Sequence, residues 1–277
     1  MKIRETLKNM LHNKMFIAGA TIFVFVLVLT VFAKYIAPHH FSEANINDAL
    51  LAPSAQYPFG TDQYGRCIFS RVIYGSQIAL KVGMLVVTVE TLIGVSLGLI
   101  AGYYGSWADK VILFITDLTW SMPPLIIALA IVTMLGPSLN NVVIAIAVVS
   151  WAQFTRVVRT KTQSIKNLPY VEAAKVFGES DFNIMLRYIL PNVASSIIVL
   201  GSLALPSAIL STTSLGFLGL GAQPPAADWG LILSDGTNYI KSAPWISIFP
   251  GLAIMFTVLG FNLLGEGLRD FLDLRLK

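Results

Sequence analysis

Residues 168–192 read LPYVEAAKVFGESDFNIMLRYILPN, a polar and charged stretch that lies between two long apolar runs. A polar segment held between membrane spans stands on one side of the bilayer. Its paired alanines and its glycine favour a short helix that fits closely against another surface. The stretch therefore predicts a docking element, and a docking element implies a partner.

The spacing within this stretch predicts a two-turn helix over 169–178. Pro169 suits the first turn, where its missing N–H costs nothing. Gly178 stands where a helix ends in a residue of positive φ, and Ser180 is placed to cap the next helix, which runs into the fifth span. A helix of two turns is not stable alone, so we expect it to pack on something. Four residues at helical spacing form its apolar face: Tyr170, Ala173, Ala174 and Phe177.

The composition indicates an integral membrane protein. Hydrophobic residues make up 55% of the 277 residues and charged residues only 12%, with a mean hydropathy of +0.72. A soluble domain carries about a quarter charged residues, and this chain has too few to form such a shell. The single cysteine, Cys67, excludes an intrachain disulfide and a cysteine-based zinc cluster.

Apolar length predicts six spanning helices, because a helix satisfies its own backbone in lipid and needs about 20 residues to cross. The first run is too long for the apolar core of a cleavable signal peptide. The fifth span is expected to be interrupted by Pro206. The six predicted spans are 15–36, 79–102, 111–135, 141–158, 189–218 and 245–266.

The distribution of basic residues predicts the orientation. With six spans both termini lie on the same side, and if that side is the cytoplasm it carries 14 of the 19 Lys and Arg residues. Cytoplasmic loops carry such an excess. We therefore expect cytoplasmic termini, a cytoplasmic loop over 156–188 and an extracytoplasmic loop over 37–77. Within the latter, an amphipathic helix is expected with Phe69, Val72 and Ile73 on one face. A second outer segment covers 219–243.

The stretch at 168–192 resembles the Glu-Ala-Ala loop of the membrane subunits of ATP-binding cassette (ABC) importers, whose pattern is E-A-A-x3-G-x9-I-x-L-P. Tyr188 replaces the isoleucine of the pattern. The matching residues are Glu172, Ala173, Ala174, Gly178, Leu190 and Pro191. In that family the loop is a coupling helix that sits in a groove of the ATPase subunit. The resemblance thus implies ATPase docking by Glu172, Ala173, Ala174, Phe177 and Gly178.

Further motifs resemble the C-type membrane subunits of the dipeptide, oligopeptide and nickel transport group. They follow in order along nearly the whole chain: PFGTDQYGR at 58–66, FLGLG at 217–221, QPP at 223–225, WG at 229–230 and LGEGLRD at 264–270. Cys67 replaces the usual aspartate after Gly65-Arg66, which puts an ion pair of that loop in doubt. Leu274 replaces a proline and affects only the tail.

The resemblance implies an all-α, type I ABC importer permease domain that covers 1–277, with a five-helix core over 79–266. It also implies a multi-pass protein of a bacterial or archaeal inner membrane. The implied partners are a homologous second permease, two ATPase subunits that hold ATP and magnesium, an extracytoplasmic solute-binding protein and the lipid bilayer. No nucleic acid is expected, and no cofactor on this chain. Candidates for binding-protein docking are Thr61, Asp62, Arg66 and Trp229.

Several polar residues in the spans have both a structural and a functional interpretation. Glu90 and Asp117 lie in apolar runs, where a charge is costly and functional by default, but a hydrogen-bonded carboxyl inside the bundle is the interpretation that we favour. Hydroxyl residues of the fifth span either tighten helix packing or line a wet pathway, and the resemblance favours the pathway. These hydroxyl residues are Ser207, Ser211, Thr212, Thr213 and Ser214.

Enzyme and metal motifs are missing from the sequence. It has no G-x-x-x-x-G-K-[ST] and no H-E-x-x-H, so this chain is not expected to be the ATPase or any other enzyme. His39-His40 lacks carboxylate or thiol neighbours, and no metal site is expected there. The energy for transport must then come from another polypeptide.

The implied function is to form part of the translocation path for di- and oligopeptides. Two alternatives stay open: the same architecture with nickel or a metal chelate as cargo, and an ion-coupled secondary transporter that acts alone. The latter would favour inverted repeats or paired charges within the membrane, and the sequence gives neither.

Overall fold

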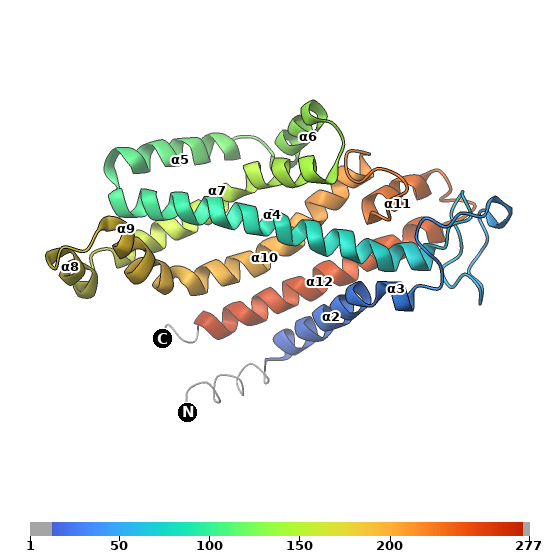
Figure 1. Cartoon of the computed structure of the whole chain (residues 1–277), viewed down its shortest axis with the longest axis horizontal. Coiled ribbons are helices and arrows are strands. Elements are labelled where there is room, and N and C mark those ends of the chain that lie inside the picture. The colour runs from blue at the N-terminus through green and yellow to red at the C-terminus, as the bar shows by residue number, and fades with distance from the viewer. Residues whose placement is uncertain (1–12, 274–277) are drawn as a thin grey trace.

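The computed structural model describes residues 13–273, which form an elongated bundle of helices (Figure 1). The predicted all-α fold is confirmed for this part of the chain. Its helices are α2 (Lys14–Val31), α3 (Ala33–Ile36), η1 (Ile46–Asp48), α4 (Ile68–Tyr104), α5 (Ser106–Trp120), α6 (Pro124–Leu135), α7 (Leu139–Ile165), α8 (Pro169–Val176), α9 (Asp181–Asn183), η2 (Ile184–Ile189), α10 (Leu190–Phe217), α11 (Trp229–Thr237) and α12 (Trp245–Asp273). Leu274 and the terminal basic residues Lys2, Arg4, Lys8, Arg275 and Lys277 lie outside the described residues.

Five of the described helices are long and apolar enough to cross a membrane: α2, α4, α7, the continuous run Asp181–Phe217, and α12. A sixth span arises only if the pair α5 and α6 is counted as one. Figure 1 places α8 at one end of the bundle and the loop 38–67 at the other, and the end of α12 points toward the end that holds α8.

The predicted single helix over 111–135 is wrong, because α5 and α6 meet at a bend of 86°. The break lies at 121–123, directly before Pro124, and Pro123 has an extended conformation. A proline has no N–H to donate, and the residue before a proline avoids helical dihedral angles. The Pro123-Pro124 pair therefore ends α5 and starts a new helix in another direction.

Other predicted boundaries also differ. The amphipathic segment and the second span form one helix of 37 residues, α4, so the predicted loop 37–77 ends at Cys67. The short fourth span is a helix of 27 residues, α7. α10 continues through Pro206, so the predicted interruption there is wrong. A proline inside a membrane helix is tolerated where neighbouring groups satisfy the freed carbonyl.

The centre of the bundle is the close packing of α4 against α7, which depends on glycines spaced four residues apart on α4. A Cβ atom at Gly94 would lie 2.4 Å from the Cβ of Phe154, and one at Gly102 would lie 2.5 Å from the Cβ of Thr162. Small residues let membrane helices approach this closely. The Thr155 hydroxyl also donates to the Gly94 carbonyl at 3.2 Å.

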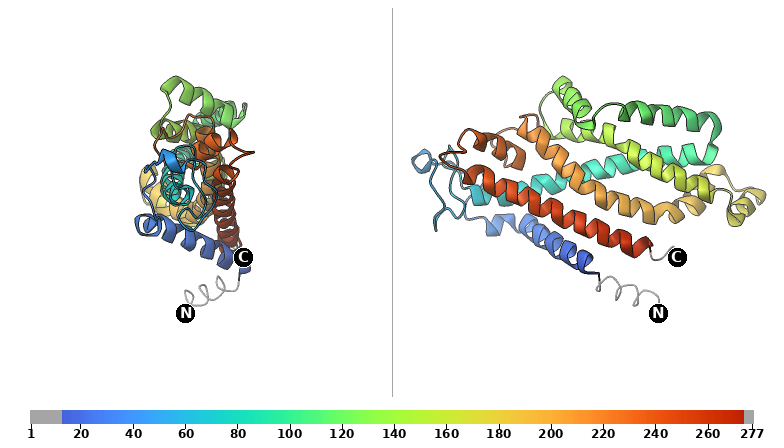
Figure 2. Two further views of the ribbon diagram at one scale, coloured as in Figure 1. Left: turned by 90° about the vertical axis from the view of Figure 1, so that its right-hand side faces the viewer. Right: turned by 180° about the vertical axis from the view of Figure 1, so that it is seen from behind.

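The remaining long helices surround this pair. Seen from behind, α10 lies between α7 and α12 (Figure 2, right). α2 packs along α12 on the outside of the bundle, where a Cβ atom on Gly19 would lie 2.2 Å from the backbone nitrogen of Leu264. The N-terminal helix is thus fixed to the last helix by direct backbone contact.

A buried arginine joins the outer segments at the far end of the bundle. Arg71 of α4 is 1% exposed. Its guanidinium donates to the carbonyls of Phe41, Pro225 and Ala226 at 3.1, 3.3 and 3.2 Å. Its Nε lies 3.7 Å from Oδ2 of Asp62. Two loops that lie far apart in the chain, one at Phe41 and one at Pro225-Ala226, are therefore held by one side chain.

Candidate functional site

The docking helix predicted from the sequence is present as α8. Pro169 occupies its first turn. Gly178 follows with φ of +81°, in the left-handed region that glycine adopts at least cost. The N–H groups of Gly178 and Glu179 donate to the carbonyls of Lys175 and Ala174 at 3.0 and 3.1 Å. The predicted helix and its glycine stop are confirmed.

One face of α8 is packed on the bundle. Val171 and Ala174 are 0% and 5% exposed and belong to a cluster with Leu99, Ile184 and Ile189. The sequence analysis did not include Val171. It packs in the same cluster as Leu99 and Tyr103 and so lies on the side of α8 that faces the end of α4. These tertiary contacts explain why so short a helix is stable, because its intrinsic helix propensity alone would not hold it.

Tyr103, near the end of α4, ties this region together. Its hydroxyl donates to Oδ1 of Asp181 at 2.6 Å. The Lys175 ammonium lies 5.1 Å from the centre of its ring, and the Lys166 ammonium donates to its carbonyl at 3.3 Å. These contacts link α8 and the helix after it to the end of α4.

The adjoining face of α8 is open. Phe177 is 87% exposed and Tyr170 is 43% exposed. A groove of about 500 Å³ runs along this face. It is lined by Tyr170, Ala173, Ala174, Phe177, Gly178, Glu179 and Tyr188. Large exposed aromatic side chains beside a groove are typical of an interaction surface.

The helix after α8 connects this surface to α10. The Ser180 hydroxyl accepts from the N–H of Asn183 at 3.3 Å, which confirms the predicted cap. Residues 184–189 are wound as a π-helix, η2, which the sequence did not predict. Such turns are rare and often occur at functional sites. Tyr188, the departure from the family pattern, lies in η2 and faces the groove.

The hydroxyl residues of α10 do not share one face. Thr213 and Ser214 line an open cleft of about 770 Å³ between α10, α11 and α12. Ser207 is exposed, and Ser211 is half-buried. Thr212 is 3% exposed and donates its hydroxyl to the Ala208 carbonyl, so it faces the interior and does not line the cleft. Consecutive residues of a helix point in different directions, which the composition alone does not resolve.

The four candidates for binding-protein docking lie inside the protein. Thr61, Asp62, Arg66 and Trp229 are 0%, 2%, 6% and 3% exposed. The Arg66 Nε donates to Oδ2 of Asp62 at 2.6 Å, so the loop keeps an ion pair although Cys67 replaces the usual aspartate. Direct contact of these four side chains with a partner is contradicted by their burial.

Outside the membrane-spanning segments, burial and hydrogen bonding raise the pKa of three groups, two carboxyls and one tyrosine hydroxyl. Burial raises the pKa of Asp228, which caps α11 by accepting from the N–H of Leu231 at 3.0 Å. Burial also raises the pKa of Asp235, which lies 3.8 Å from Arg66. A hydrogen bond to Asp48 raises the pKa of the Tyr57 hydroxyl.

The two carboxyls within the spans differ in setting. Glu90 is 3% exposed in α4 and faces Ser150 of α7, in agreement with the structural interpretation. Asp117 is exposed and forms an ion pair with Arg156 of α7, a partner that the sequence analysis did not name. Glu90 and Asp117 have different partners, so they do not form a proton relay with each other.

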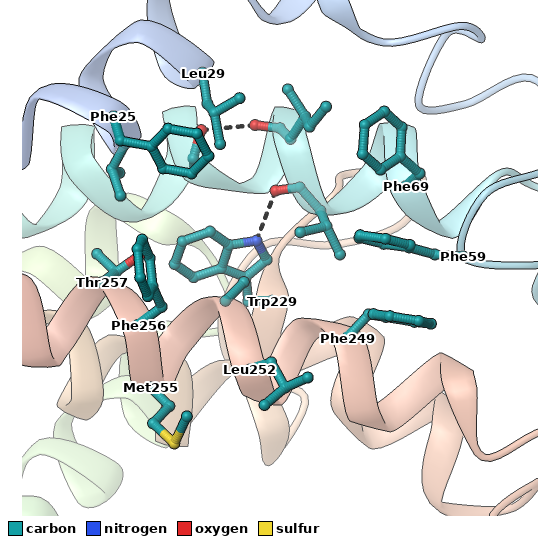
Figure 3. A pocket seen from close by; sticks show the side chains of 15 residues that line it. Phe25, Leu29, Phe59, Phe69, Trp229, Phe249, Leu252, Met255, Phe256 and Thr257 are labelled. Atoms are coloured by element: carbon teal, nitrogen blue, oxygen red, sulfur yellow. Dashed lines mark hydrogen bonds between the residues drawn. The ribbon is translucent and has the colours of Figure 1, made fainter. Parts of the chain in front are cut away.

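An apolar pocket of about 570 Å³ lies between α2, α4 and α12 (Figure 3). The indole of Trp229 forms part of its wall and donates to the Val72 carbonyl at 2.9 Å. Phe25, Phe69 and Phe256 point into it from three helices. The pocket offers no charged group, so it supplies packing space and no chemistry.

Comparisons with known proteins agree with the geometry. A family described as "Binding-protein-dependent transport system inner membrane component" matches residues 94–277. A second, "N-terminal TM domain of oligopeptide transport permease C", matches residues 3–53. The two matches together cover both ends of the chain and include α8 and its groove.

Full-length relatives are similar to the whole chain. The dipeptide transport system permease protein DppC of Alkalihalophilus pseudofirmus is 45% identical over 274 residues, which are 99% of this chain and 90% of the relative. The glutathione transport system permease protein GsiD of Pectobacterium atrosepticum is 40% identical over 278 residues, 99% of this chain and 91% of the relative. GsiD of Escherichia coli is 43% identical over 270 residues, 96% and 88% of the two chains.

Proposed function

The chain belongs to the family of binding-protein-dependent transport system inner membrane components, and we propose that its cargo is di- and oligopeptides. It is a multi-pass permease subunit of an ABC importer in the inner membrane. The relatives described above are named for dipeptide and glutathione transport. Glutathione is itself a tripeptide, so both names support short peptides. Neither name supports the alternative of nickel as cargo.

The proposed topology has six spans with both termini in the cytoplasm. The bent pair α5 and α6 counts as the third span in this topology, with the break at 121–123 inside the membrane. The basic residues of the loop between α7 and α10 support a cytoplasmic position for α8. The single permease domain over 1–277, with its core over 79–266, stays a proposal on the same grounds.

The proposed complex contains four further subunits, of which two are ATPases. The chain carries no G-x-x-x-x-G-K-[ST] motif, so ATP and magnesium belong to the ATPase subunits. A second, homologous permease completes the membrane part, and an extracytoplasmic solute-binding protein delivers cargo. An ion-coupled transporter that acts alone would have no use for an open groove on α8.

We propose that α8 is the coupling helix through which the ATPases move the bundle. The observation that carries this proposal is the open groove of α8 with Phe177 at its edge. Closure of the ATPases around ATP would displace α8, and the contacts of Tyr103 would pass the displacement to α4. The bundle then opens outward, and hydrolysis resets it inward. Nucleotide binding inverts this equilibrium only if the two states differ by a few kcal/mol.

On the outer side we propose an indirect role for the predicted docking residues. Asp62, Arg66 and Trp229 would shape the loop 38–67 and α11, and exposed neighbours such as Tyr64 would touch the binding protein. For the pathway, we propose Thr213 and Ser214 as lining residues of the cleft between α10 and α12, with Ser207 and Ser211 next to them.

An alanine substitution at Phe177 tests the coupling role. In the reconstituted five-subunit complex, Phe177→Ala should lower peptide uptake about tenfold, as loss of an interface anchor does. Phe182→Ala is the matched control, because Phe182 is 65% exposed but does not line the groove. The membrane level of both variants should equal that of the wild type.

Two further substitutions extend the test, one that changes the backbone at the end of α8 and one that changes a charge on it. Gly178→Pro removes the left-handed stop, and Glu172→Lys reverses an exposed charge of α8. Both should abolish the stimulation of ATP hydrolysis by peptide, and uptake with it, while membrane insertion survives. Normal stimulation of ATP hydrolysis in both variants would exclude α8 as the coupling element.

A further inference from the structure

An exposed ion pair lies in the part of the bundle formed by α5 and α7. Asp117 of α5 pairs with Arg156 of α7, and their side chains are 64% and 40% exposed. The guanidinium also stacks on the ring of Trp120, 4.5 Å from its centre. Its Nε is buried and has no hydrogen-bond partner. Much of the surface of both side chains is therefore accessible, although the Nε donor is not.

Both residues of this pair lie within the helices of the proposed third and fourth spans. Asp117 is 11 residues from the start of α5, which corresponds to about 16 Å of helix. No charged residue occurs between Asp117 and Arg156 in the sequence. A charged side chain of a spanning helix is costly against lipid and faces protein or water instead.

The break between α5 and α6 supports the same conclusion independently. Residues 121–123 are not helical, and all three are exposed. Irregular backbone at membrane depth is tolerated only where protein covers it or where it borders a water-filled cavity. The break directly follows Trp120, so the exposed backbone and the exposed ion pair adjoin each other.

A row of polar side chains continues from the pair along α7. Gln153, Arg156 and Thr160 recur at i, i+3 and i+7 and so share one face of the helix. Gln153 and Thr160 are exposed. The row runs from the ion pair toward the end of α7 that leads to α8. A polar row of this kind is disfavoured against lipid, so its neighbour is water or the polar surface of another protein.

We propose that Asp117, Arg156 and Trp120 form a cargo-contact site on the inner half of the translocation route, which takes the zwitterionic backbone of a short peptide. Arg156 binds the terminal carboxylate in a bidentate manner, for which a guanidinium is suited. Asp117 binds the terminal ammonium. This inference rests on the proposed peptide import. Asp117 and Arg156 neutralise each other when no cargo is bound. Their ion pair therefore re-forms as the peptide leaves the site.

Thiol labelling of the assembled complex tests whether this face is wet. Cys67 is the one cysteine of the chain, so a Cys67→Ser background allows a single probe. Gln153→Cys should react with a water-soluble maleimide in the nucleotide-free complex. Ile144→Cys, on an apolar and exposed part of α7, is the lipid-facing control and should not react. Failure of Gln153→Cys to react in the complex would mean that a second subunit covers the face, and it would overturn the proposal.

Protection by cargo tests the ligand class. An unblocked dipeptide at about four times its dissociation constant should slow labelling of Gln153→Cys about fivefold, and its N-acetylated amide should not slow it. Arg156→Gln should abolish the protection. Asp109→Asn is the matched control, since it breaks the neighbouring ion pair of α5 and α7, Asp109 with Arg159, and should leave protection intact.

The two proposals fail separately in this experiment. Equal protection by the free and the blocked dipeptide, or protection that survives Arg156→Gln, would refute the site. Uptake of peptide by the wild-type complex is measured in parallel and tests the import function alone.

Discussion

A Cβ atom on Gly98 of α4 would lie 2.7 Å from the Cβ of Val158 of α7. No real Cβ atom approaches another so closely, so the two helices touch backbone to side chain at this point. Gly94 and Gly102 make the same kind of contact one turn to either side. The α4 and α7 pair is thus built on three glycines in a row.

Replacement of Gly98 by alanine should therefore destabilise the protein. The added methyl group meets Val158 and the Thr155 carbonyl, and relief of such overpacking costs about 1–3 kcal/mol. Gly201→Ala is the matched control, because the nearest atom to its new Cβ would be 3.7 Å away. The unfolding temperature of each variant is measured by thermal unfolding of the purified protein in detergent. Equal unfolding temperatures for the two variants would disprove the close packing of α4 and α7.

Loss of the buried arginine should loosen the outer end of the bundle. Arg71→Met leaves three part-buried carbonyls without their donor, and each hydrogen bond from a charged donor contributes about 1.5–3 kcal/mol. Hydrogen exchange should rise in the loop 38–67 and in 219–228, while α8 keeps the protection of the wild type. Lys241→Ala, at an exposed lysine of the outer end, should change neither region. Unchanged exchange in Arg71→Met would contradict the role of Arg71 as a clamp.

Asp228 should make stability depend on pH in a defined direction. Because burial raises its pKa above the ordinary value of 3.8, the folded protein binds the proton more tightly than the unfolded chain. The resulting stability is fully present below about pH 4 and is lost as the pH rises through the raised pKa.

The variant Asp228→Asn isolates this effect. Asparagine is as good a cap for α11 as aspartate and cannot ionise. Above about pH 5 the variant should be at least as stable as the wild type, and its unfolding temperature should vary less with pH. Asp228→Ala loses the cap and should be less stable by about 1 kcal/mol. A wild type and an asparagine variant with parallel pH profiles would refute the raised pKa.

Cys67 offers a test of the helix start. It is the cap residue of α4, and its side chain makes no capping hydrogen bond. Serine is a preferred cap and is close in volume, so Cys67→Ser should keep or raise the unfolding temperature, by up to about 1 kcal/mol in stability. Cys67→Val, also similar in size, cannot cap and should bring no gain. A serine variant less stable than the valine variant would contradict the assignment.

The sequence predicted those elements whose signals are local. Apolar length located the spans, and Pro169 with Gly178 marked both ends of α8. The bend of 86° at Pro123-Pro124 does not follow from apolar length, although two adjacent prolines are a strong local signal for it. The continuity of α4 from Ile68 was missed because its outer part is covered by loops that come from distant parts of the chain.

The sequence predicts which types of residue form the site, but it does not predict the direction in which each side chain points. Thr212 and Thr213 are adjacent hydroxyl residues, yet one lies in the core and the other in the cleft. Arg66 and Asp62 occur in a motif, but only the fold places them inside the protein. The pairing of Asp117 with Arg156 joins positions 39 residues apart, and no periodicity within one helix reveals a contact between two helices.

The sidedness of α8 tests the central claim most directly. In a Cys67→Ser background, Glu172→Cys is labelled with a membrane-impermeant maleimide in right-side-out and in inside-out vesicles, and Ala55→Cys of the outer loop serves as the opposite control. We expect Glu172→Cys to react only in inside-out vesicles and Ala55→Cys only in right-side-out vesicles. Reaction of Glu172→Cys from the outside of the cell would contradict coupling of this helix to a cytoplasmic ATPase.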